Sequence, residues 1–546
     1  MTKFYTFFVL LLIFSCTSKV DEINSEEKFK AFVENFNVSS NSGDISDLGI
    51  ASFATELENT RNQLKILMAI DTSQLSFEDK IDWSFAQSIL KGKEVRQSKH
   101  ESWKRDPRDY MQFRSLDNLI GKPGDLTKKA IELEKRLRLV PIQLANGKAQ
   151  LETYVPRFQE LGLFMAESAR GLFNKDLPDF ISKLPNNNLE NLVKSAGEAL
   201  EDYVTYLSDE LPKKTQGDFA MGKEAYNTIL ANELLLDYDD TTLWEFGNMK
   251  FKETIAELEA LAKEIDPSKT WQELAVEIKN EYPEPHEMIA AHQLWVDSAK
   301  AHILRNKLIP LPWNEQVKVV PRVEYLRKTS YYGNFSRAKG KDADSIFTAQ
   351  WMINPFEDQW DDKTKQEYLV EHDWGVIIVT APHEAYGGHH VQGLYQLHNP
   401  RKLRRENGLS LFSEGWGLYN EQLMSETGFF PDKRIHLRQL QLRLWRNARV
   451  IYDVGMHSGR LTYEQAISIM TDKVGFLRWA AQLEIDSSAA RPGYFIGYYM
   501  GMTEILKMRE MYKQKMGDSF SLSDFHEKLL KIGNMPPKLM EESLLE

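Results

Sequence analysis

The 546-residue sequence contains one cysteine, Cys16, so no disulfide can form within a single molecule. It also lacks an excess of basic residues, because its formal net charge is −12 at pH 7. Proteins that bind nucleic acids usually carry a basic face that releases counterions from phosphates, so we expect no nucleic-acid partner. No internal repeat or low-complexity tract is visible. These absences argue against a disulfide scaffold, a nucleic-acid-binding protein and a repeat array.

One long apolar run stands out, over residues 4–14 and directly after Lys3. It is too short for a membrane-spanning helix of roughly 20 residues but fits the apolar part of a secretory signal. Ser15 followed by Cys16 resembles a bacterial lipobox. We therefore predict a lipoprotein signal peptide over 1–15, a lipidated Cys16 with a polar tether over 16–25, and an exported lipoprotein of the cell envelope that contacts the membrane through its lipid anchor only. The alternative is an ordinary cleaved signal with an incidental cysteine.

Helical spacing of apolar residues dominates the chain from residue 26 to about 310. After Pro310 and Pro312, residues 317–325 and 345–353 are rich in β-branched and aromatic side chains, which indicates a small sheet. Helical texture returns beyond Trp360. The sequence thus predicts a mainly α fold with a small β-sheet beside a central cleft. We expect a helical N-terminal subdomain over 26–310 and a metal-binding catalytic subdomain over 311–546.

The strongest chemical signal is the run from His383 to His390, which reads His-Glu-Ala-Tyr-Gly-Gly-His-His. Neutral imidazole is a preferred zinc ligand, and a glutamate beside a ligating histidine can take a proton from water at the metal. Zinc helices usually carry their two histidines four residues apart on one face. His389 lies six residues after His383, so a regular helix would point it about 120° away. His390 would share the face of His383 but lie about 10 Å further along the helix.

Gly387 and Gly388 provide a means of distorting the helix, because glycine reaches backbone angles that other residues avoid. We therefore predict a kinked zinc helix with His383 and His389 as ligands, and leave open whether His390 replaces His389. A helix that ends at the glycine pair, with histidines bonded only to carbonyl groups, is the alternative.

Glu414, in the segment Glu-Gly-Trp-Gly, is the candidate third ligand, because catalytic zinc is often held by two histidines and one glutamate. Glu421 lies two helical turns later on nearly the same face. It could orient a ligand, although we expect it to lie on the solvated surface.

Together these segments resemble the bacterial family called domain of unknown function eight-eight-five, of the gluzincin clan of metallopeptidases. The family's His-Glu-x-x-Pro-Gly-His-His-x-Gln pattern is matched from His383 to Gln392, with Gly387 in place of proline, which we expect to preserve the kink. The Glu-Gly-Trp segment at Glu414 also matches, as do segments containing His457 and Tyr498. Tyr494 stands where we expect glutamine. The resemblance implies a large helical gluzincin-like metallohydrolase fold and a zinc site.

The expected function is therefore that of a zinc-dependent hydrolase, most simply a metallopeptidase. Zn²⁺ would be held by His383, His389 and Glu414, with Glu384 as the general base. The expectations for the other candidate side chains are that His457 and Tyr498 donate hydrogen bonds to the oxyanion and that Arg491 binds a substrate carboxylate. Each of these three also has a structural interpretation, as a buried histidine, a core tyrosine or an ion-paired arginine.

The substrate is expected to be a peptide or a small amide, and the strand-like segment 345–353 could hold an extended peptide as an edge strand. Hydrolysis of a non-peptide amide or ester is an alternative, because activated water attacks any polarised carbonyl. A lipid-anchored binding protein without turnover is another. Manganese, cobalt or iron would bind similar ligands. The sequence gives no indication of the oligomeric state.

Overall fold

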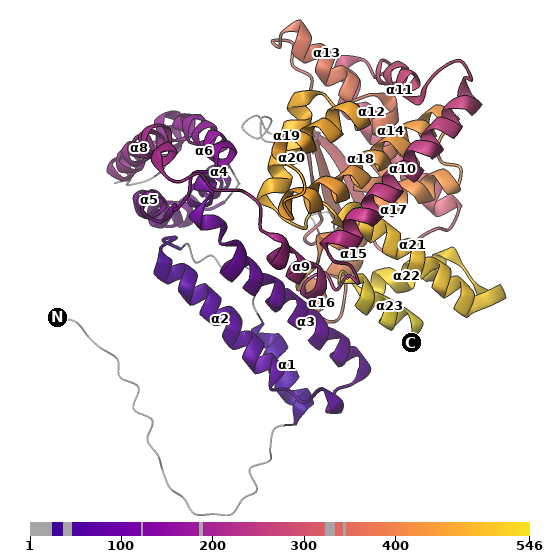
Figure 1. Cartoon of the computed structure of the whole chain (residues 1–546), viewed down its shortest axis with the longest axis horizontal. Coiled ribbons are helices and arrows are strands. Elements are labelled where there is room, and N and C mark those ends of the chain that lie inside the picture. Colours follow the sequence, from indigo (N-terminus) through magenta and orange to yellow (C-terminus); the bar gives the residue numbers. More distant parts are fainter. Residues whose placement is uncertain (1–23, 37–45, 122–123, 185–188, 323–332, 342–344) are drawn as a thin grey trace, which may run out of the picture.

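The computed structural model describes residues 24–36, 46–121, 124–184, 189–322, 333–341 and 345–546. Helices dominate these residues, and three short strands form one sheet (Figure 1). The mainly helical fold with a small sheet is therefore confirmed. The predicted signal peptide and Cys16 lie outside the described residues. Among the described helices, none is both long enough and apolar enough to cross a membrane.

The N-terminal helices form two groups (Figure 1). The first group lies against the large body of the protein and consists of α1 (Ser25–Asn35), α2 (Ile50–Met68) and α3 (Phe77–Val95). The second is a bundle with its own buried core. Its helices are α4 (Phe113–Gly121), α5 (Leu126–Gln150), α6 (Pro156–Ser168), α7 (Leu177–Ile181) and α8 (Glu190–Thr205).

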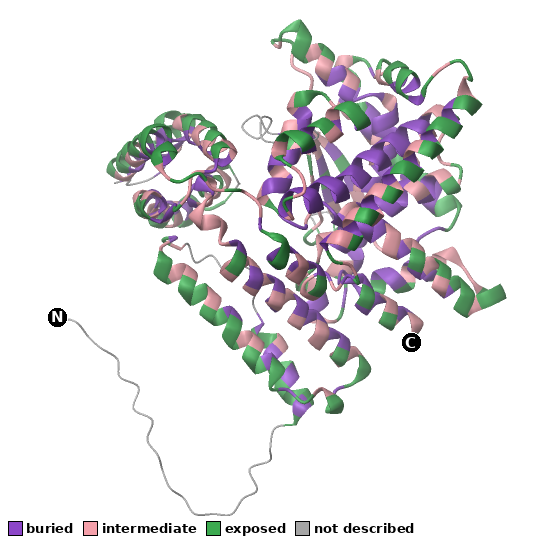
Figure 2. Ribbon diagram, viewed as in Figure 1, coloured by how far each residue is buried: buried purple, intermediate pink, exposed green. Residues whose placement is uncertain are grey.

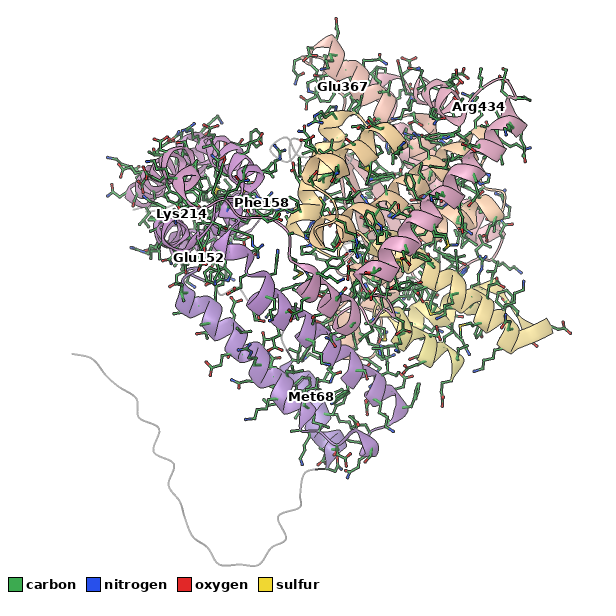
Figure 3. All side chains as sticks on the ribbon, in the orientation of Figure 1. Met68, Glu152, Phe158, Lys214, Glu367 and Arg434 are labelled. Carbon is green, nitrogen blue, oxygen red and sulfur yellow. The ribbon has the colours of Figure 1, made fainter. Side chains whose placement is uncertain are left out.

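The bundle touches the large body through a small apolar cluster and an ion pair. Phe158, which is labelled in Figure 3, packs with Val155 and with Ala489 of the body. Beside this cluster Arg157 binds Asp486 through two contacts of 2.6 and 2.7 Å. The bidentate geometry fixes the orientation of the guanidinium, so the bundle is attached at a defined point.

The large body contains the remaining helices and the sheet (Figure 1). The helices before the sheet are α9 (Lys223–Asn232), α10 (Asp240–Ile265), α11 (Trp271–Lys279) and α12 (Met288–Arg305). Those after it are α13 (Asp362–Glu371), α14 (Trp374–Glu384), α15 (His389–Leu397), α16 (Lys402–Glu406), α17 (Ser410–Glu426), α18 (Lys433–His457), α19 (Tyr463–Ser468), α20 (Arg478–Ala490), α21 (Gly497–Met516), α22 (Leu522–Ile532) and α23 (Pro537–Leu545).

Helices from both sides of residue 310, where we expect a subdomain boundary, share one buried core. Helix α10 packs along α18, and α12 packs against α14. Leu258 of α10 and Leu444 of α18, for example, lie in the same buried cluster. Buried residues fill the centre of this body, whereas the bundle exposes its outer faces (Figure 2). The division at residue 310 stays a prediction. Helices from both sides of it line the cavity that contains the histidine-rich run.

The sheet has the strand order β1 (Glu315–Pro321), β3 (Phe347–Ile353), β2 (Asn334–Ser336). Strand β3 pairs with β1 in parallel and with β2 antiparallel. The two segments predicted to form strands therefore contain β1 and β3. The expectation that 345–353 is an edge strand is wrong, because β3 lies between the other two. In the described sheet β2 takes the edge position beside the candidate site.

Candidate metal centre

The histidine-rich run forms the end of one helix and the start of the next. Helix α14 begins after Asp373, whose side chain caps the backbone N–H of Val376, and it ends at Glu384. The chain then turns, and α15 begins at His389. The predicted interruption of the helix at the glycine pair is therefore present, and the two helices bring His383 and His389 together.

Both glycines of the turn are required by close contacts. Gly387 has φ +97°, and a Cβ at this position would lie 2.3 Å from Oδ1 of Asn420. A Cβ at Gly388 would lie 1.8 Å from the carbonyl oxygen of His383. Proline fixes φ near −65°, so it could not adopt the conformation of Gly387. The expected kink is therefore present with glycine at position 387, in a conformation that only a residue with positive φ can adopt.

The imidazole rings of His383 and His389 face the carboxylate of Glu414 on α17. Their Nε2 atoms lie 3.7 and 3.3 Å, respectively, from Oε2 of Glu414. Ligand atoms in a tetrahedral zinc site with bonds of about 2.0–2.1 Å are about 3.4 Å apart. The two distances to Glu414 are therefore close to the separation expected between zinc ligands.

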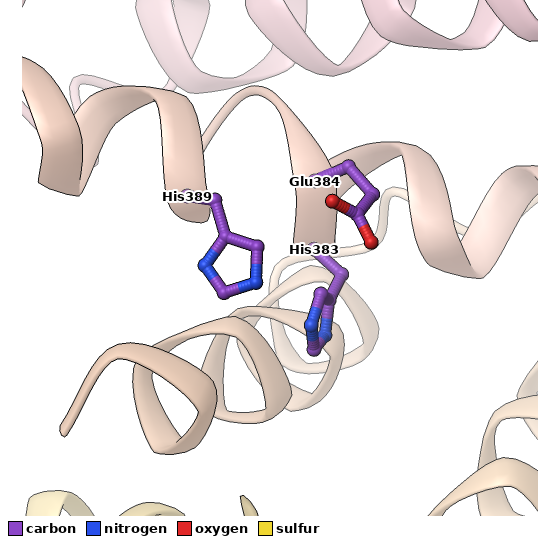
Figure 4. Close-up of side chains that lie close together, drawn as sticks. All are labelled: His383, Glu384 and His389. Atoms are coloured by element: carbon purple, nitrogen blue, oxygen red, sulfur yellow. The ribbon is translucent and has the colours of Figure 1, made fainter. Parts of the chain in front are cut away.

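Glu384 lies beside these ligands. Ligand atoms of His383, Glu384 and His389 all lie within 4.8 Å of one another (Figure 4). Glu384 is partly exposed to the cavity, and within the described part of the chain no hydrogen bond or ion pair holds its carboxylate. Glu414 makes the shorter contacts to both imidazoles, which favours Glu414 as the ligand and leaves Glu384 available to exchange protons with water.

A second glutamate of α17 holds His383 in position. Oε1 of Glu421 accepts a hydrogen bond of 2.8 Å from Nδ1 of His383, and the Glu421 side chain is 0% exposed. The expectation of a solvated Glu421 is therefore wrong. A carboxylate that binds the outer nitrogen fixes the tautomer of a metal-binding histidine and increases its basicity. Gly417 leaves room for this ring, because a Cβ there would lie 2.6 Å from Cε1 of His383.

His390 belongs to a different network. Its Nε2 lies 2.5 Å from Oε2 of Glu315, which also accepts a hydrogen bond from Tyr386 and pairs with Lys300. This buried cluster joins α15 to the start of strand β1. The geometry therefore favours His389 as the second ligand and gives His390 a structural role.

The ligands are strongly coupled by charge. Burial by itself lowers the pKa of His383, but the carboxylates of Glu414 and Glu421 raise it to about 9. Burial by itself raises the pKa of Glu414, but the rings of His389 and His383 hold it well below its usual range. The cluster therefore favours positive charge between its members, and a divalent cation would provide that charge in place of protons.

The ligands lie on the wall of a cavity of about 560 Å³. Tyr494 and Tyr498, near the start of α21, line the same cavity. The hydroxyl of Tyr494 donates a hydrogen bond of 3.1 Å to Oε1 of Glu414, and the Tyr498 ring stacks on His383 at 6.3 Å. Burial raises the pKa of Tyr494 to about 12 and that of Tyr498 well above its usual value. Both phenols are therefore protonated at neutral pH and can donate hydrogen bonds.

The structure does not bring His457 to this cavity. Its Nδ1 accepts a hydrogen bond from the backbone of Met221, and its Nε2 lies 3.1 Å from the carbonyl oxygen of Ser488. The ring is fully buried against Tyr226. With both nitrogens bound to backbone groups, His457 is a core residue, and its predicted role as an oxyanion donor is corrected.

Arginines form another wall of the cavity, and three of them were not predicted from the sequence. Arg491, predicted to bind substrate, lines the cavity with its guanidinium 4.5 Å from the ring centre of Tyr494. Arg337, Arg446 and Arg449 join it. The two from α18 follow one another at a spacing of three residues, but no local motif distinguishes them from other arginines of that helix.

Comparison with known proteins places this fold in a family. No curated protein sequence matches the chain. A solved structure of a candidate lipoprotein of unknown function from Shewanella oneidensis is similar, with a TM-score of 0.81, 19% identity and coverage of 96% of this chain and 100% of that chain. A candidate lipoprotein from Colwellia psychrerythraea gives a TM-score of 0.75 and 17% identity, with coverage of 96% of both chains. These identities establish a shared fold.

The sequence model of one family extends over almost the whole chain. The family is described as bacterial protein of unknown function (DUF885), and its model matches residues 35–544. The match includes both helices of the histidine-rich run, the Glu414 segment and the cavity residues around Tyr494. The chain therefore belongs to this family of bacterial proteins, DUF885.

Proposed function

We propose that the chain is a zinc-dependent hydrolase of the gluzincin type that cleaves peptide bonds. The observation that carries this proposal is that two imidazoles approach the Glu414 carboxylate at distances close to those between zinc ligands. Beside them lies Glu384, whose carboxylate makes no hydrogen bond or ion pair among the described residues. A structural zinc site is usually closed by four protein ligands, whereas a catalytic site has three and faces a cavity. The arrangement here matches the second kind.

The ion would be held by His383, His389 and Glu414, and when bound it would polarise a carbonyl group and lower the pKa of water. Glu384 accepts the proton from the attacking water, because its carboxylate faces the cavity and has no partner within the described part of the chain. Tyr498 supplies an O–H donor to the same cavity, whereas the O–H of Tyr494 is directed at Glu414. A correctly placed donor of this kind contributes on the order of a hundredfold to the rate of acyl transfer.

A peptide substrate is favoured by the position of strand β2. Asn334 and Phe335 of this strand line the cavity, and β2 is the edge strand of the described sheet. An extended peptide can be held along such a strand by backbone hydrogen bonds, independently of its side chains. The cavity volume of about 560 Å³ accommodates a few residues of such a chain.

The test is elemental analysis of the purified protein from which residues 1–16 have been removed. About one zinc per chain is expected in the wild type and in Glu384→Gln, and none in the double variant His383→Ala, Glu414→Ala. His286→Ala is the matched control, because the His286 side chain is 69% exposed and lies outside the cavity. A peptide library should then be cleaved by the wild type and left intact by Glu384→Gln. Equal metal in all variants, or metal without cleavage of any peptide, would contradict the proposal.

We also propose that the protein is exported and anchored through Cys16. The lipobox-like pair Ser15-Cys16 supports this, and two proteins of the same fold are candidate lipoproteins. Cells that express the full chain are expected to incorporate labelled palmitate into it. Cys16→Ala should remove the label, and persistence of the label in this variant would contradict the assignment.

A further inference from the structure

Four arginines on the cavity wall differ in how their charge is compensated. On α18, Arg449 pairs with Glu484 at 2.5 Å, and Nη2 of Arg446 lies 3.6 Å from Glu421. These two therefore have carboxylate partners within the protein. They add positive potential to the cavity without requiring a ligand.

Arg337 has no such partner among the residues that the structure describes. It follows strand β2, and its hydrogen bond runs from Nη1 to the neutral amide oxygen of Gln396, at 3.1 Å. Within the described residues no carboxylate lies at ion-pair distance from its guanidinium. Burial lowers the pKa of Arg337, so its surroundings disfavour the charged guanidinium. The more distant carboxylates of Glu414 and Glu384 offset this effect only in part. A desolvated guanidinium without a carboxylate is costly unless a ligand provides one.

The position of Arg337 is fixed by the helix that carries His389. Gln396, on α15, donates a hydrogen bond of 2.8 Å to the carbonyl oxygen of Asn407 and receives one from Gln392. A Cβ at Gly393 would lie 3.1 Å from Cδ of Arg337, so the side chain lies close against α15. The amide network therefore orients the guanidinium toward the cavity that it lines, in a fixed relation to the metal ligands.

We propose that Arg337 binds a carboxylate of the substrate, so that the preferred substrates are peptides with a negative charge next to the scissile amide. The charge can be a C-terminal carboxylate or an acidic side chain, and both offer two oxygens to the planar guanidinium. Arg491 lies on the same wall and strengthens the positive field. Its only side-chain hydrogen bond among the described residues runs to the carbonyl oxygen of Ser487. This inference rests on the proposed peptidase function and deepens it.

The experiment uses three matched libraries of N-acetylated tripeptides with the zinc-loaded protein, and cleavage is followed by mass spectrometry. The first has neutral side chains and a C-terminal carboxamide, the second has neutral side chains and a free carboxylate, and the third has an acidic side chain and a carboxamide. Faster cleavage of the second library identifies a C-terminal carboxylate as the ligand, and faster cleavage of the third identifies an acidic side chain.

The preferred library should be cleaved on the order of 30-fold faster than the neutral carboxamides, since truncating one partner of a buried charge pair costs about 2 kcal/mol or more. Arg337→Gln should remove this preference, and Arg337→Lys should restore part of it. Arg478→Gln is the control, because Arg478 is an exposed arginine paired with Glu464. Equal cleavage of all three libraries by the wild type, or a preference that persists in Arg337→Gln, would overturn the inference.

Binding separates this inference from the proposed function. Glu384→Gln and the double variant Glu384→Gln, Arg337→Gln would be titrated with the same peptides by calorimetry, with and without zinc. Tighter binding of the anionic peptides that is lost with Arg337 supports the carboxylate site even if the wild type cleaves no peptide. Equal binding of anionic and neutral peptides to Glu384→Gln would overturn it, whatever the wild type hydrolyses.

Discussion

Replacing Gly417 by alanine should weaken metal binding without unfolding the helix that carries it. The added Cβ would lie 2.6 Å from Cε1 and 2.7 Å from Nε2 of His383. Ordinary contacts between carbon atoms are about 3.5–4.0 Å, so the imidazole must move by roughly 1 Å. The hydrogen bond of 2.8 Å from Nδ1 to Glu421 resists that movement, because it holds the ring against α17.

The expected size of the effect follows from the role of the displaced nitrogen. Loss of a single outer partner of a metal-binding histidine typically costs about 10- to 100-fold in metal affinity. Moving the ligand atom itself should cost at least as much. Alanine is the better helix former by up to about 1 kcal/mol, so α17 should remain folded.

Zinc affinity would be measured by competition with a chelating dye, and folding by circular dichroism. Gly171→Ala is the matched control, because Gly171 has helical backbone angles and no atom lies within 4 Å of the place that an added methyl group would take. It should retain the wild-type affinity. A Gly417→Ala protein that binds zinc as tightly as Gly171→Ala would refute the assignment of His383 as a ligand held against α17.

Three further results are expected. His390→Ala should retain zinc by elemental analysis. Its free energy of unfolding should be lower by about 1–3 kcal/mol, because the buried Glu315 loses one partner. Loss of zinc in this variant would restore His390 as a ligand candidate. Gly388→Ala should lose both zinc and a sharp thermal transition, since its Cβ would overlap the His383 carbonyl, and an unchanged transition would argue against the turn. Burial lowers the pKa of His292 to about 3 and of His526 to about 4, from a usual 6.5. The unfolded chain therefore takes up protons before the folded chain as the pH falls below about 6.5. The melting temperature of the EDTA-treated protein should fall from pH 7.5 to pH 5, and less steeply in His526→Gln. Equal slopes in the two proteins would show that His526 does not cause the pH dependence.

The sequence was sufficient for the local part of the site. His383, Glu384 and His389 are close in the chain, and the glycine pair between them indicates the break that brings the two imidazoles together. Glu414 was found because glutamate beside glycine and tryptophan forms a recognisable segment. Helical periodicity and the β-branched segments gave the fold class for the same reason, since each depends on neighbouring residues.

The remaining parts of the site depend on contacts between distant segments. Arg337 reaches the cavity from the end of a short strand, and its position has no local signature. Glu421 was expected in solvent because its helix face alone does not show that α14 covers it. The segment of His457 matches the family, but that match does not distinguish a cavity residue from a core residue with two backbone partners.

The six-residue spacing of the histidines is explained by the way α17 supports the turn between α14 and α15. Trp416 donates a hydrogen bond of 2.7 Å to the carbonyl oxygen of Gly387, and Asn420 lies against the same glycine. Glu414 of the same helix faces both imidazoles, so α17 carries the proposed third ligand while it stabilises the break that positions the other two. A regular helix would hold two histidines four residues apart without help. Here the ligand geometry depends on the packing of α17, which is why the histidine run has metal-binding geometry only in the folded protein.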